Sequence, residues 1–223
     1  MTSFIVAPVV ETDFDCLLKY TDEEGGTLAA PFLFSSWPAS DPASTAHRNA
    51  WSVEQQRWQF HNDPTAKFMK VEDTSTGEIV SLARWHRYSD GYPQEDGYTE
   101  VDVFAPPGTT PKFPTGINGP LHAGFLTEAC RRRADYVKPG VCWILTTLIT
   151  REKWRRQGAG GLLLQWGLKK AAEEGAPAYI EALPTAIQTY NRHGFKHFQD
   201  TKVDCTPWGL DGEFTFAIMR KDP

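Results

Sequence analysis

The strongest structural signal in the sequence lies in residues 142–175, which read CWILTTLITREKWRRQGAGGLLLQWGLKKAAEEG. Residues 142–150 are apolar or β-branched, which is typical of a buried strand. Residues 151–157 carry four cations and one acid, and glycines at 158, 160 and 161 then open a run with helical periodicity. Gly175 and Pro177 mark the end of that run. The stretch therefore predicts a strand, a basic loop, a glycine-rich turn and a helix.

The glycine-rich turn has the features of an anion-binding site. The first N–H groups of a helix have no intrahelical acceptor, and the helix dipole adds partial positive charge at the same end. Glycines allow a ligand to approach the backbone, and Arg155 and Arg156 add full positive charges beside them. A phosphate or pyrophosphate is the ligand that such a turn favours. Tight packing of the turn is the alternative explanation of its glycines.

The spacing of the motif narrows the choice of phosphate ligand. No Lys-Ser or Lys-Thr follows the glycines, and Leu163 stands where a dinucleotide fingerprint needs Gly or Ala. The pattern that fits is Arg-x-x-Gly-x-Gly at Arg155, Gly158 and Gly160, which resembles the acetyl-CoA motif of the GCN5-related N-acetyltransferases (GNAT). A second stretch, AIQTYNRHGF at residues 186–195, resembles a helix of the same family and follows a predicted strand at 178–183.

The resemblance implies a fold of the α/β class, with a central twisted mixed β-sheet that splays between its fourth and fifth strands and is flanked by helices. We expect one N-acetyltransferase domain over residues 1–223. The main departure from the family pattern is an insertion at about residues 89–140, before the central strand, which puts in doubt any carry-over of acceptor-site residues.

The resemblance also implies how acetyl-CoA is bound. The pantetheine arm would pair with the backbone at Leu148, Ile149 and Thr150, and an N–H near Leu148 would polarise the thioester carbonyl. The pyrophosphate would lie over residues 157–161, and Asn191 would reach the arm from the other wall unless it is an ordinary surface amide. The implied cofactor-binding residues are Leu148, Ile149, Thr150, Arg155, Arg156, Gln157, Gly158, Ala159, Gly160, Gly161 and Asn191.

The implied reaction is direct attack of a neutral amine on the thioester. Tyr190 matches the tyrosine of the family motif and is the candidate acid for the departing thiolate, although it also suits a packing role. Candidates for the base are Glu100, Asp102, His86 and Glu181, with a water chain as an alternative, and we choose Glu100. A small-molecule amine is the expected acceptor. A CoA sensor without turnover, a protein N-acetyltransferase and an O-acyltransferase remain open.

Composition restricts the other classes of function. The chain has 223 residues, 40% of them hydrophobic, with a net charge of −5 and a pI of about 5.7, which disfavours binding to nucleic acid. No apolar run approaches about 18 residues, so no membrane association is expected. Cys16, Cys130 and Cys142 have apolar neighbours and predict buried free thiols in a cytoplasmic protein, and the cysteine spacing indicates no metal site. We expect a monomer or a homodimer.

The rest of the chain predicts further elements. We expect strands at residues 4–10, 195–203 and 213–221, a hairpin at 66–72 and 78–88, and helices from Thr12 to Tyr20, from Pro42 to about Asn62 and over 121–137. Residues 21–40 predict an irregular segment carrying Phe32, Phe34 and Trp37. Residues 90–120 are rich in proline and glycine and predict a lid with a short strand at 98–104.

Overall fold

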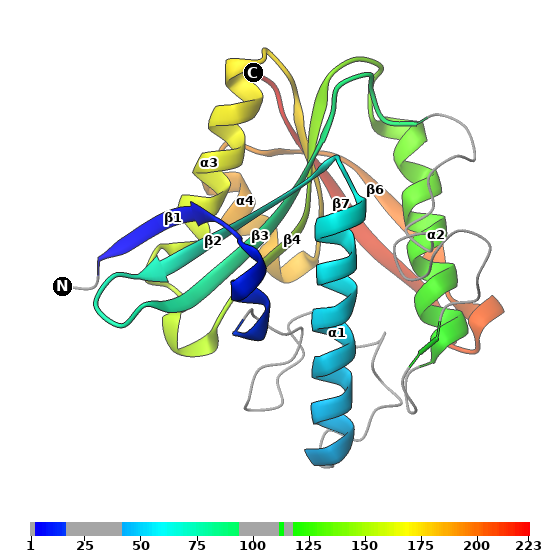
Figure 1. Cartoon of the computed structure of the whole chain (residues 1–223). Coiled ribbons are helices and arrows are strands. Elements are labelled where there is room, and N and C mark those ends of the chain that lie inside the picture. Colours follow the sequence, from blue (N-terminus) through cyan, green and yellow to red (C-terminus); the bar gives the residue numbers. More distant parts are fainter. Residues whose placement is uncertain (1–2, 17–41, 94–111, 114–117) are drawn as a thin grey trace.

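The computed structural model describes residues 3–16, 42–93, 112–113 and 118–223 (Figure 1). The strands are β1 (Phe4–Pro8), β2 (Ala66–Asp73), β3 (Glu78–Tyr88), β4 (Cys142–Thr150), β5 (Ala178–Ala182), β6 (Lys196–Asp204) and β7 (Glu213–Lys221). The helices are α1 (Pro42–Asn62), α2 (Gly119–Tyr136), α3 (Ala159–Glu173) and α4 (Ile187–Arg192). Short 3₁₀ helices include η1 (Glu11–Asp15), η4 (Glu152–Trp154) and η6 (Thr206–Trp208).

The strands form one mixed sheet in the order β1-β2-β3-β4-β5-β7-β6. Neighbouring strands are antiparallel, apart from β4 and β5, which are parallel. The parallel pair is joined through α3, as a parallel connection requires. Figure 1 shows the strands close together at one end of the sheet and fanned apart at the other. The predicted mixed sheet, splayed between its fourth and fifth strands, is confirmed.

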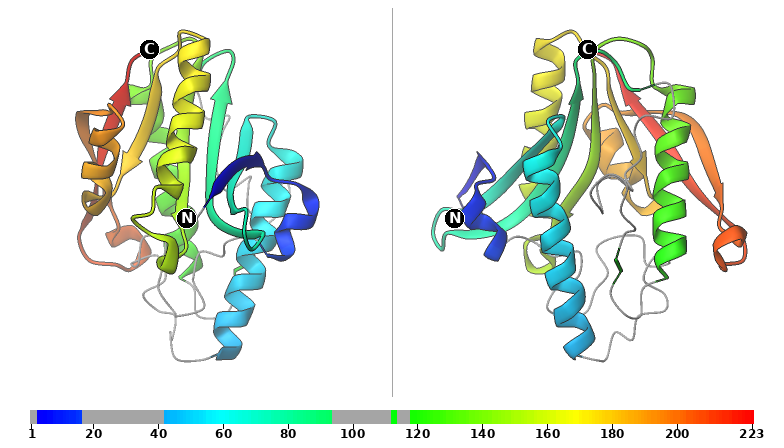
Figure 2. Two further views of the ribbon diagram at one scale, coloured as in Figure 1. Left: turned by 90° about the vertical axis from the view of Figure 1, so that its left-hand side faces the viewer. Right: turned by 45° about the vertical axis from the view of Figure 1, so that its right-hand side comes forward.

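Each face of the sheet is covered by two helices (Figure 2). Trp85, Leu145 and Ile180 face α3 and α4, and they share a core with Leu163 and Tyr190 from those helices. The opposite face packs against α1 and α2 through two further cores, one formed with α2 and one with α1. Alternate residues of a strand point to opposite faces, so the strands in the middle of the sheet are buried on both sides.

The element pattern follows the sequence prediction closely in the C-terminal half and departs from it near the N-terminus. Thr12 does not cap an α-helix; it lies inside η1, which follows Val10. The reason is local, because the Val10 N–H donates to Oδ2 of Asp13 at 2.7 Å and closes a tight turn. Residues 17–20, the aromatic segment 21–40, most of the predicted lid and its strand at 98–104 lie outside the described residues.

The insertion between β3 and β4 contributes α2, which packs against the sheet through Leu121, Phe125 and Tyr136. Asn118 caps this helix, because its side chain accepts a hydrogen bond from the Leu121 N–H at 3.1 Å. The expected helix over 121–137 is therefore present, beginning two residues earlier.

The cysteines are free, and three of the four are buried. Cys130 and Cys142 are buried as predicted, whereas the prediction was wrong for Cys16, which is exposed at the end of η1. Burial raises the pKa of Cys142 to about 11, so this thiol stays protonated and is a poor nucleophile at neutral pH. Within the described part of the chain, no helix has the length and apolar character needed to cross a membrane.

Candidate active site

The candidate site begins where β4 loses its parallel neighbour. β4 and β5 pair at Trp143–Ala178, Ile144–Tyr179 and Leu145–Ile180. Beyond Leu145, no residue of β4 pairs with β5 in the described part of the chain, although β4 continues to Thr150 and keeps its pairing with β3. Residues 146–150 therefore have an open backbone edge on the side of β5.

A β-bulge determines which backbone groups reach this open edge. Pairing of β3 with β4 passes from Trp85–Leu145 to Arg84–Thr147, so Thr146 is an extra residue on β4. Trp143 donates its N–H toward β5, to the Pro177 carbonyl, whereas Arg151 donates toward β3, to the Val80 carbonyl, each at 3.0 Å.

In a regular strand, residues an even number apart direct their N–H groups to the same edge. Trp143 and Arg151 are an even number apart and donate to opposite edges, so the bulge between them reverses the alternation. Counting back from Arg151 places the N–H groups of Leu148 and Thr150 on the open edge and that of Ile149 toward β3. The Ile149 carbonyl indeed accepts a hydrogen bond from Oγ of Ser81, on β3, at 2.7 Å.

The glycine-rich turn lies against the same end of β4. Gly158 has a left-handed backbone (φ 94°) and caps the N-terminus of α3. A Cβ added to Gly160 would lie 3.2 Å from Oγ1 of Thr150 and 3.9 Å from the Leu148 side chain. A Cβ on Gly161 would lie 3.3 Å from the His193 ring, so packing contributes to the choice of both residues. The start of α3 therefore lies against the side chains of Leu148 and Thr150, at the end of β4 where its edge is not paired with β5.

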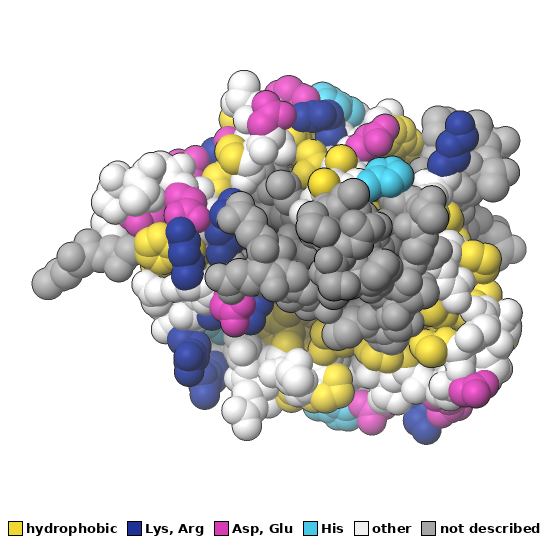
Figure 3. Space-filling model, turned by 90° about the horizontal axis from the view of Figure 1, so that it is seen from below, with side chains coloured by type: hydrophobic (Ala, Val, Ile, Leu, Met, Phe, Trp, Pro, Cys, Tyr) yellow, Lys and Arg dark blue, Asp and Glu magenta, His cyan; other side chains and the backbone are white. Residues whose placement is uncertain are grey.

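The charged residues of the loop before the turn have two kinds of surroundings. Arg151 and Lys153 both contact Glu78 at the start of β3, with N–O distances of 3.3 and 2.8 Å. Arg155 and Arg156 are exposed, and Arg155 Nε donates to the Thr150 carbonyl at 3.3 Å. Figure 3 shows Lys and Arg side chains gathered on the side of the molecule where α3 begins.

The backbone of this loop also suits an anion. Arg156 has φ 61°, which is uncommon for a residue other than glycine. Together with Gly158 it brackets Gln157, which does not share this left-handed conformation. Alternating backbone handedness is the geometry in which successive N–H groups converge on an anion. The Gln157 side chain is used within the loop, where its Nε2 donates to the Lys153 carbonyl at 2.8 Å.

The second motif forms α4 on the same face of the sheet as α3. Tyr190 is 8% exposed and packs edge-on against Phe195, with 6.0 Å between the ring centroids. Burial raises the pKa of Tyr190 to about 12. Its hydroxyl has no hydrogen-bond partner among the described residues, and Asn191 on the same helix is exposed. Gly194 ends the motif with φ 87°, consistent with a helix stop.

The four candidates for the base have different surroundings. Glu100 and Asp102 lie outside the described residues. His86 is 1% exposed, and its Nδ1 lies 2.9 Å from Oγ1 of Thr65 and 3.3 Å from Oδ2 of Asp63. Burial by itself would raise the pKa of Asp63, but the hydrogen bonds from His86 and Thr65 outweigh it and hold that pKa well below its usual value.

Glu181 has its two oxygens engaged by α2. Arg133 donates from Nε and Nη2 to Oε1 and Oε2 at 2.6 and 2.8 Å, and the Tyr136 hydroxyl also bonds Oε1. Burial, followed by the negative charge of Glu181, raises the pKa of Tyr136 well above its usual value. Both oxygens of this carboxylate therefore already accept strong hydrogen bonds. Glu181 therefore ties α2 to β5 beside the point where β4 and β5 separate.

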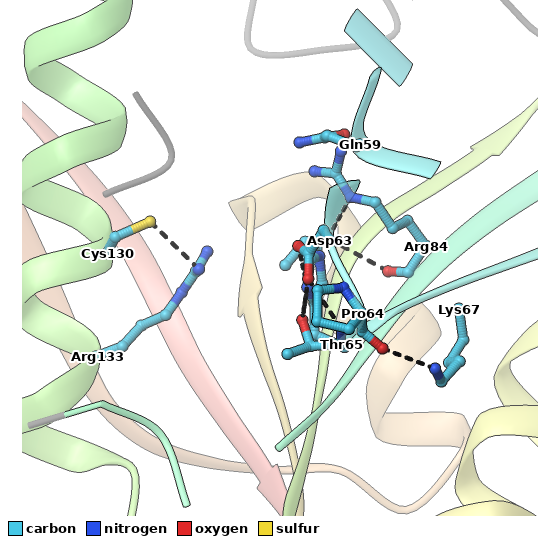
Figure 4. A network of polar contacts seen from close by, with 10 residues as sticks. Gln59, Asp63, Pro64, Thr65, Lys67, Arg84, Cys130 and Arg133 are labelled. Atoms are coloured by element: carbon cyan, nitrogen blue, oxygen red, sulfur yellow. Dashed lines mark hydrogen bonds and ion pairs between the residues drawn. The ribbon is translucent and has the colours of Figure 1, made fainter. Parts of the chain in front are cut away.

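Sequence reasoning missed Arg84, a charged residue at the same point. Arg84 is 6% exposed, and its Nε donates to Oγ1 of Thr146, in the bulge, at 2.9 Å. Figure 4 shows Arg84 extending from the sheet toward Gln59 of α1, while Arg133 reaches in from α2 on the other side. The available signal was the arginine inside the mostly apolar stretch IVSLARW, residues 79–85 of β3. A charge in such a run must be buried with partners.

Comparisons with known proteins agree with this architecture. The acetyltransferase (GNAT) family matches residues 123–195, which contain both motifs. No curated protein matches the chain in sequence. The fold matches a protein described as histone acetyltransferase HPA2 and related acetyltransferase from Corynebacterium glutamicum, with TM-score 0.56 and 24% identity, covering 100% of this chain and 97% of that one.

Two further solved structures have the same fold at lower identity. Mosquito arylalkylamine N-acetyltransferase like 5b matches with TM-score 0.60 and 12% identity, covering 99% of this chain and 100% of that one. Arabidopsis thaliana NAA60 in complex with acetyl-CoA matches with TM-score 0.51 and 10% identity, covering 99% and 98%. The GNAT family model thus matches the part of the chain that carries both motifs, and the chain as a whole has the same fold as these solved acetyltransferases.

Proposed function

We propose that this protein transfers the acetyl group of acetyl-CoA to the amine of a small molecule by direct attack on the thioester. The observation that carries the proposal is the contact between the glycine turn and the open edge of β4. Gly160 at the start of α3 adjoins Leu148 and Thr150, the residues whose N–H groups face that edge. One elongated ligand with an anionic end and an amide-bearing arm fits both features.

The proposed binding mode uses backbone groups for most contacts. The N–H groups at residues 158–161, with Arg155 and Arg156 beside them, would hold the pyrophosphate. Thr150 and Leu148 would pair with the amides of the arm as an added strand does. The Leu148 N–H would then donate to the thioester oxygen, where negative charge develops during attack. Ile149 would not contact the arm itself, because its N–H points toward β3 and its side chain packs in the core under α1.

Tyr190 would assist the leaving thiolate as a hydrogen-bond donor. A pKa of about 12, set by burial, keeps this hydroxyl protonated at neutral pH. Compared with an ordinary tyrosine, the shift adds about 3 kcal/mol to the cost of full proton transfer, at 1.36 kcal/mol per unit. Donation of a strong hydrogen bond as the C–S bond breaks avoids part of that cost. The attacking nitrogen releases one proton to water and the departing thiolate takes one from water, so the proton count balances.

The acceptor would enter from the α1 and α2 face. Arg84 on β3 and the Arg133–Glu181 pair on α2 and β5 place buried charge on both sides of the point where the sheet opens. Polar groups held in this way suit a small polar amine, which they orient beside the thioester. A protein acceptor is the second candidate, favoured by the fold shared with a protein whose description names a histone acetyltransferase.

Two measurements test this proposal. Acetyl-CoA should raise the melting temperature of the protein, with a shift that grows with the logarithm of its concentration above Kd, because only the folded state binds it. Release of free thiol from acetyl-CoA should then require an amine, and we suggest tyramine, putrescine and a lysine-containing peptide as a first panel. Binding without thiol release across a broad panel of amines would favour the sensor hypothesis, and a response to peptides alone would favour a protein acceptor.

A further inference from the structure

Reciprocal hydrogen bonds hold the bulge in β4. Arg84 Nε donates to Oγ1 of Thr146 at 2.9 Å, and the same hydroxyl donates back to the Arg84 carbonyl at 3.3 Å. The extra residue of the bulge is thus fastened, through its own side chain, to Arg84, the β3 residue that pairs with Thr147 next to the bulge. A hydroxyl serves both bonds because it can accept and donate at once.

The arginine in this pair is itself fixed. Its Nη1 bonds Oε1 of Gln59, on α1, and its side chain is 6% exposed (Figure 4). Moving a buried guanidinium away from its hydrogen-bond acceptors is costly, because it must then be solvated elsewhere or left unsatisfied. Arg84 therefore connects the bulge to a helix on the acceptor side of the sheet.

The position of the bulge has a direct chemical consequence. It reverses the alternation of β4, which is why the Leu148 N–H, and not that of Ile149, faces the open edge. A bulge that moved by one or two residues would change where along β4 this reversal occurs and how the N–H groups after it are aimed. Hydrogen bonds weaken steeply as their angle departs from linear, so the aim of the Leu148 N–H controls how strongly it polarises a carbonyl.

We propose that Arg84 and Thr146 are positioning residues for the acetyl transfer. By fixing the bulge, they aim the Leu148 N–H at the thioester oxygen without touching the substrate themselves. This inference rests on the proposed function, since it requires acetyl-CoA along the open edge. It assigns the buried charge of Arg84 a role in the chemical step, in addition to any role in stability.

The test uses acetyl-CoA labelled with ¹³C at the acetyl carbonyl and isotope-edited infrared difference spectra at saturation. Bound to wild-type protein, the carbonyl stretch should move to lower frequency than in solution. Thr146→Val removes the hydroxyl at nearly constant volume and should lose most of that displacement, as should Arg84→Lys, which lacks Nε. Thr146→Ser keeps the hydroxyl and should retain it. Thr201→Val on β6 makes the same exchange away from the site and should change nothing.

A second readout separates positioning from loss of structure. With any amine that supports turnover, Thr146→Val should lower kcat by up to about 10²-fold, approaching the loss of one oxyanion donor, while the KM for acetyl-CoA stays unchanged. Failure of the wild-type protein to bind acetyl-CoA would overturn the proposed function itself. Binding with an undisplaced wild-type carbonyl, or with equal displacement in Thr146→Val and wild type, would overturn this inference and leave the proposed function standing.

Discussion

The two faces of the sheet differ in what they bury. The face under α3 and α4 is almost entirely apolar, with Trp85, Leu145, Leu163 and Ile180 at its centre. The face under α1 and α2 contains most of the buried polar side chains among the described residues. These include Asp13, Asn49, Ser52, Gln56, Gln59, Lys70, Arg84, His86, His122 and Arg133.

This difference is expected if the two proposed ligands are recognised in different ways, the cofactor by backbone N–H groups and the acceptor by side chains. A cofactor bound by N–H groups of β4 and of the start of α3 needs little polar side-chain chemistry, so its face can pack as an ordinary core. An acceptor must be oriented by side chains, which are costly to bury unless they are paired. The pairs Arg133–Glu181 and Lys70–Asp13, with N–O distances of 2.6 and 2.7 Å, meet that requirement.

The largest expected effect concerns Tyr190 on the cofactor face. Tyr190→Phe keeps the ring in its apolar core and removes only the hydroxyl. Loss of one hydrogen-bond donor to a developing negative charge typically costs about 10²- to 10³-fold, so the single-turnover rate should fall by about that factor while acetyl-CoA affinity stays nearly unchanged. A phenylalanine variant with the wild-type single-turnover rate would show that this face is structural even at Tyr190.

Alkaline unfolding gives an independent check on the same residue. The pKa of Tyr190 is about 12 in the folded protein and about 10 when unfolded. Between these values the unfolded state loses the proton that the folded state keeps, so the free energy of unfolding falls as pH rises from about 10 toward about 12. Tyr190→Phe lacks this contribution and should show a shallower decline in urea unfolding experiments across that window.

The next effect tests the charged face. Glu181→Gln removes the charge that Arg133 contacts, and breaking a buried pair in this way costs about 3 kcal/mol or more. Glu173→Gln is the matched control, because Glu173 pairs with Lys170 at the surface, where solvent screens the interaction and little stability is lost. Urea unfolding measures both. Equal losses would mean that the α1 and α2 face does not depend on buried charge for its stability.

The sequence predicted the elements at the face under α3 and α4 far better than the buried charges of the face under α1 and α2, for a physical reason. Backbone recognition leaves a local signature, because Gly158 and Gly160 must occur at a fixed spacing beside Arg155. The strand, turn and helix that carry this signature are consecutive in the chain. The boundaries of β4 and α3 were therefore close to the prediction.

The face under α1 and α2 has no such signature, since its charged residues come from elements far apart in sequence. Arg84 meets Gln59, 25 positions away, and Arg133 meets Glu181, 48 positions away. Pairing at such distances depends on the register of the sheet and on where α2 packs. The bulge at Thr146 is equally hidden, because it follows from how β3 and β4 pair and leaves no mark in the composition of either strand.

A smaller effect is expected from glycine-to-alanine substitutions, which test how tightly a helix packs on each face of the sheet. A Cβ on Gly167 of α3 would lie 2.1 Å from Trp85, which is 0% exposed, and one on Gly124 of α2 would lie 2.2 Å from Trp208. Trp208 is only half-buried, on η6, and can move aside. Gly167→Ala should therefore cost about 1–3 kcal/mol by overpacking. Gly124→Ala should be near neutral, because alanine gains about 1 kcal/mol of helix propensity. Equal melting temperatures for the two variants would contradict this contrast.

The smallest expected effect concerns the basic loop, where Arg155 and Lys153 carry the same charge two residues apart. Lys153 Nζ lies 2.8 Å from Glu78, whereas Arg155 is exposed beside the glycine turn and has only the Thr150 carbonyl as a partner among the described residues. Arg155→Ala should weaken acetyl-CoA binding about tenfold, a modest loss because an exposed charge on a phosphate is well screened. Lys153→Ala should leave the Kd nearly unchanged. Calorimetric titration at two salt concentrations measures both, and the wild-type Kd should rise with salt more steeply than that of Arg155→Ala. If both variants lose affinity equally, the loop acts through its overall charge, and the anion is not held at the turn that opens α3.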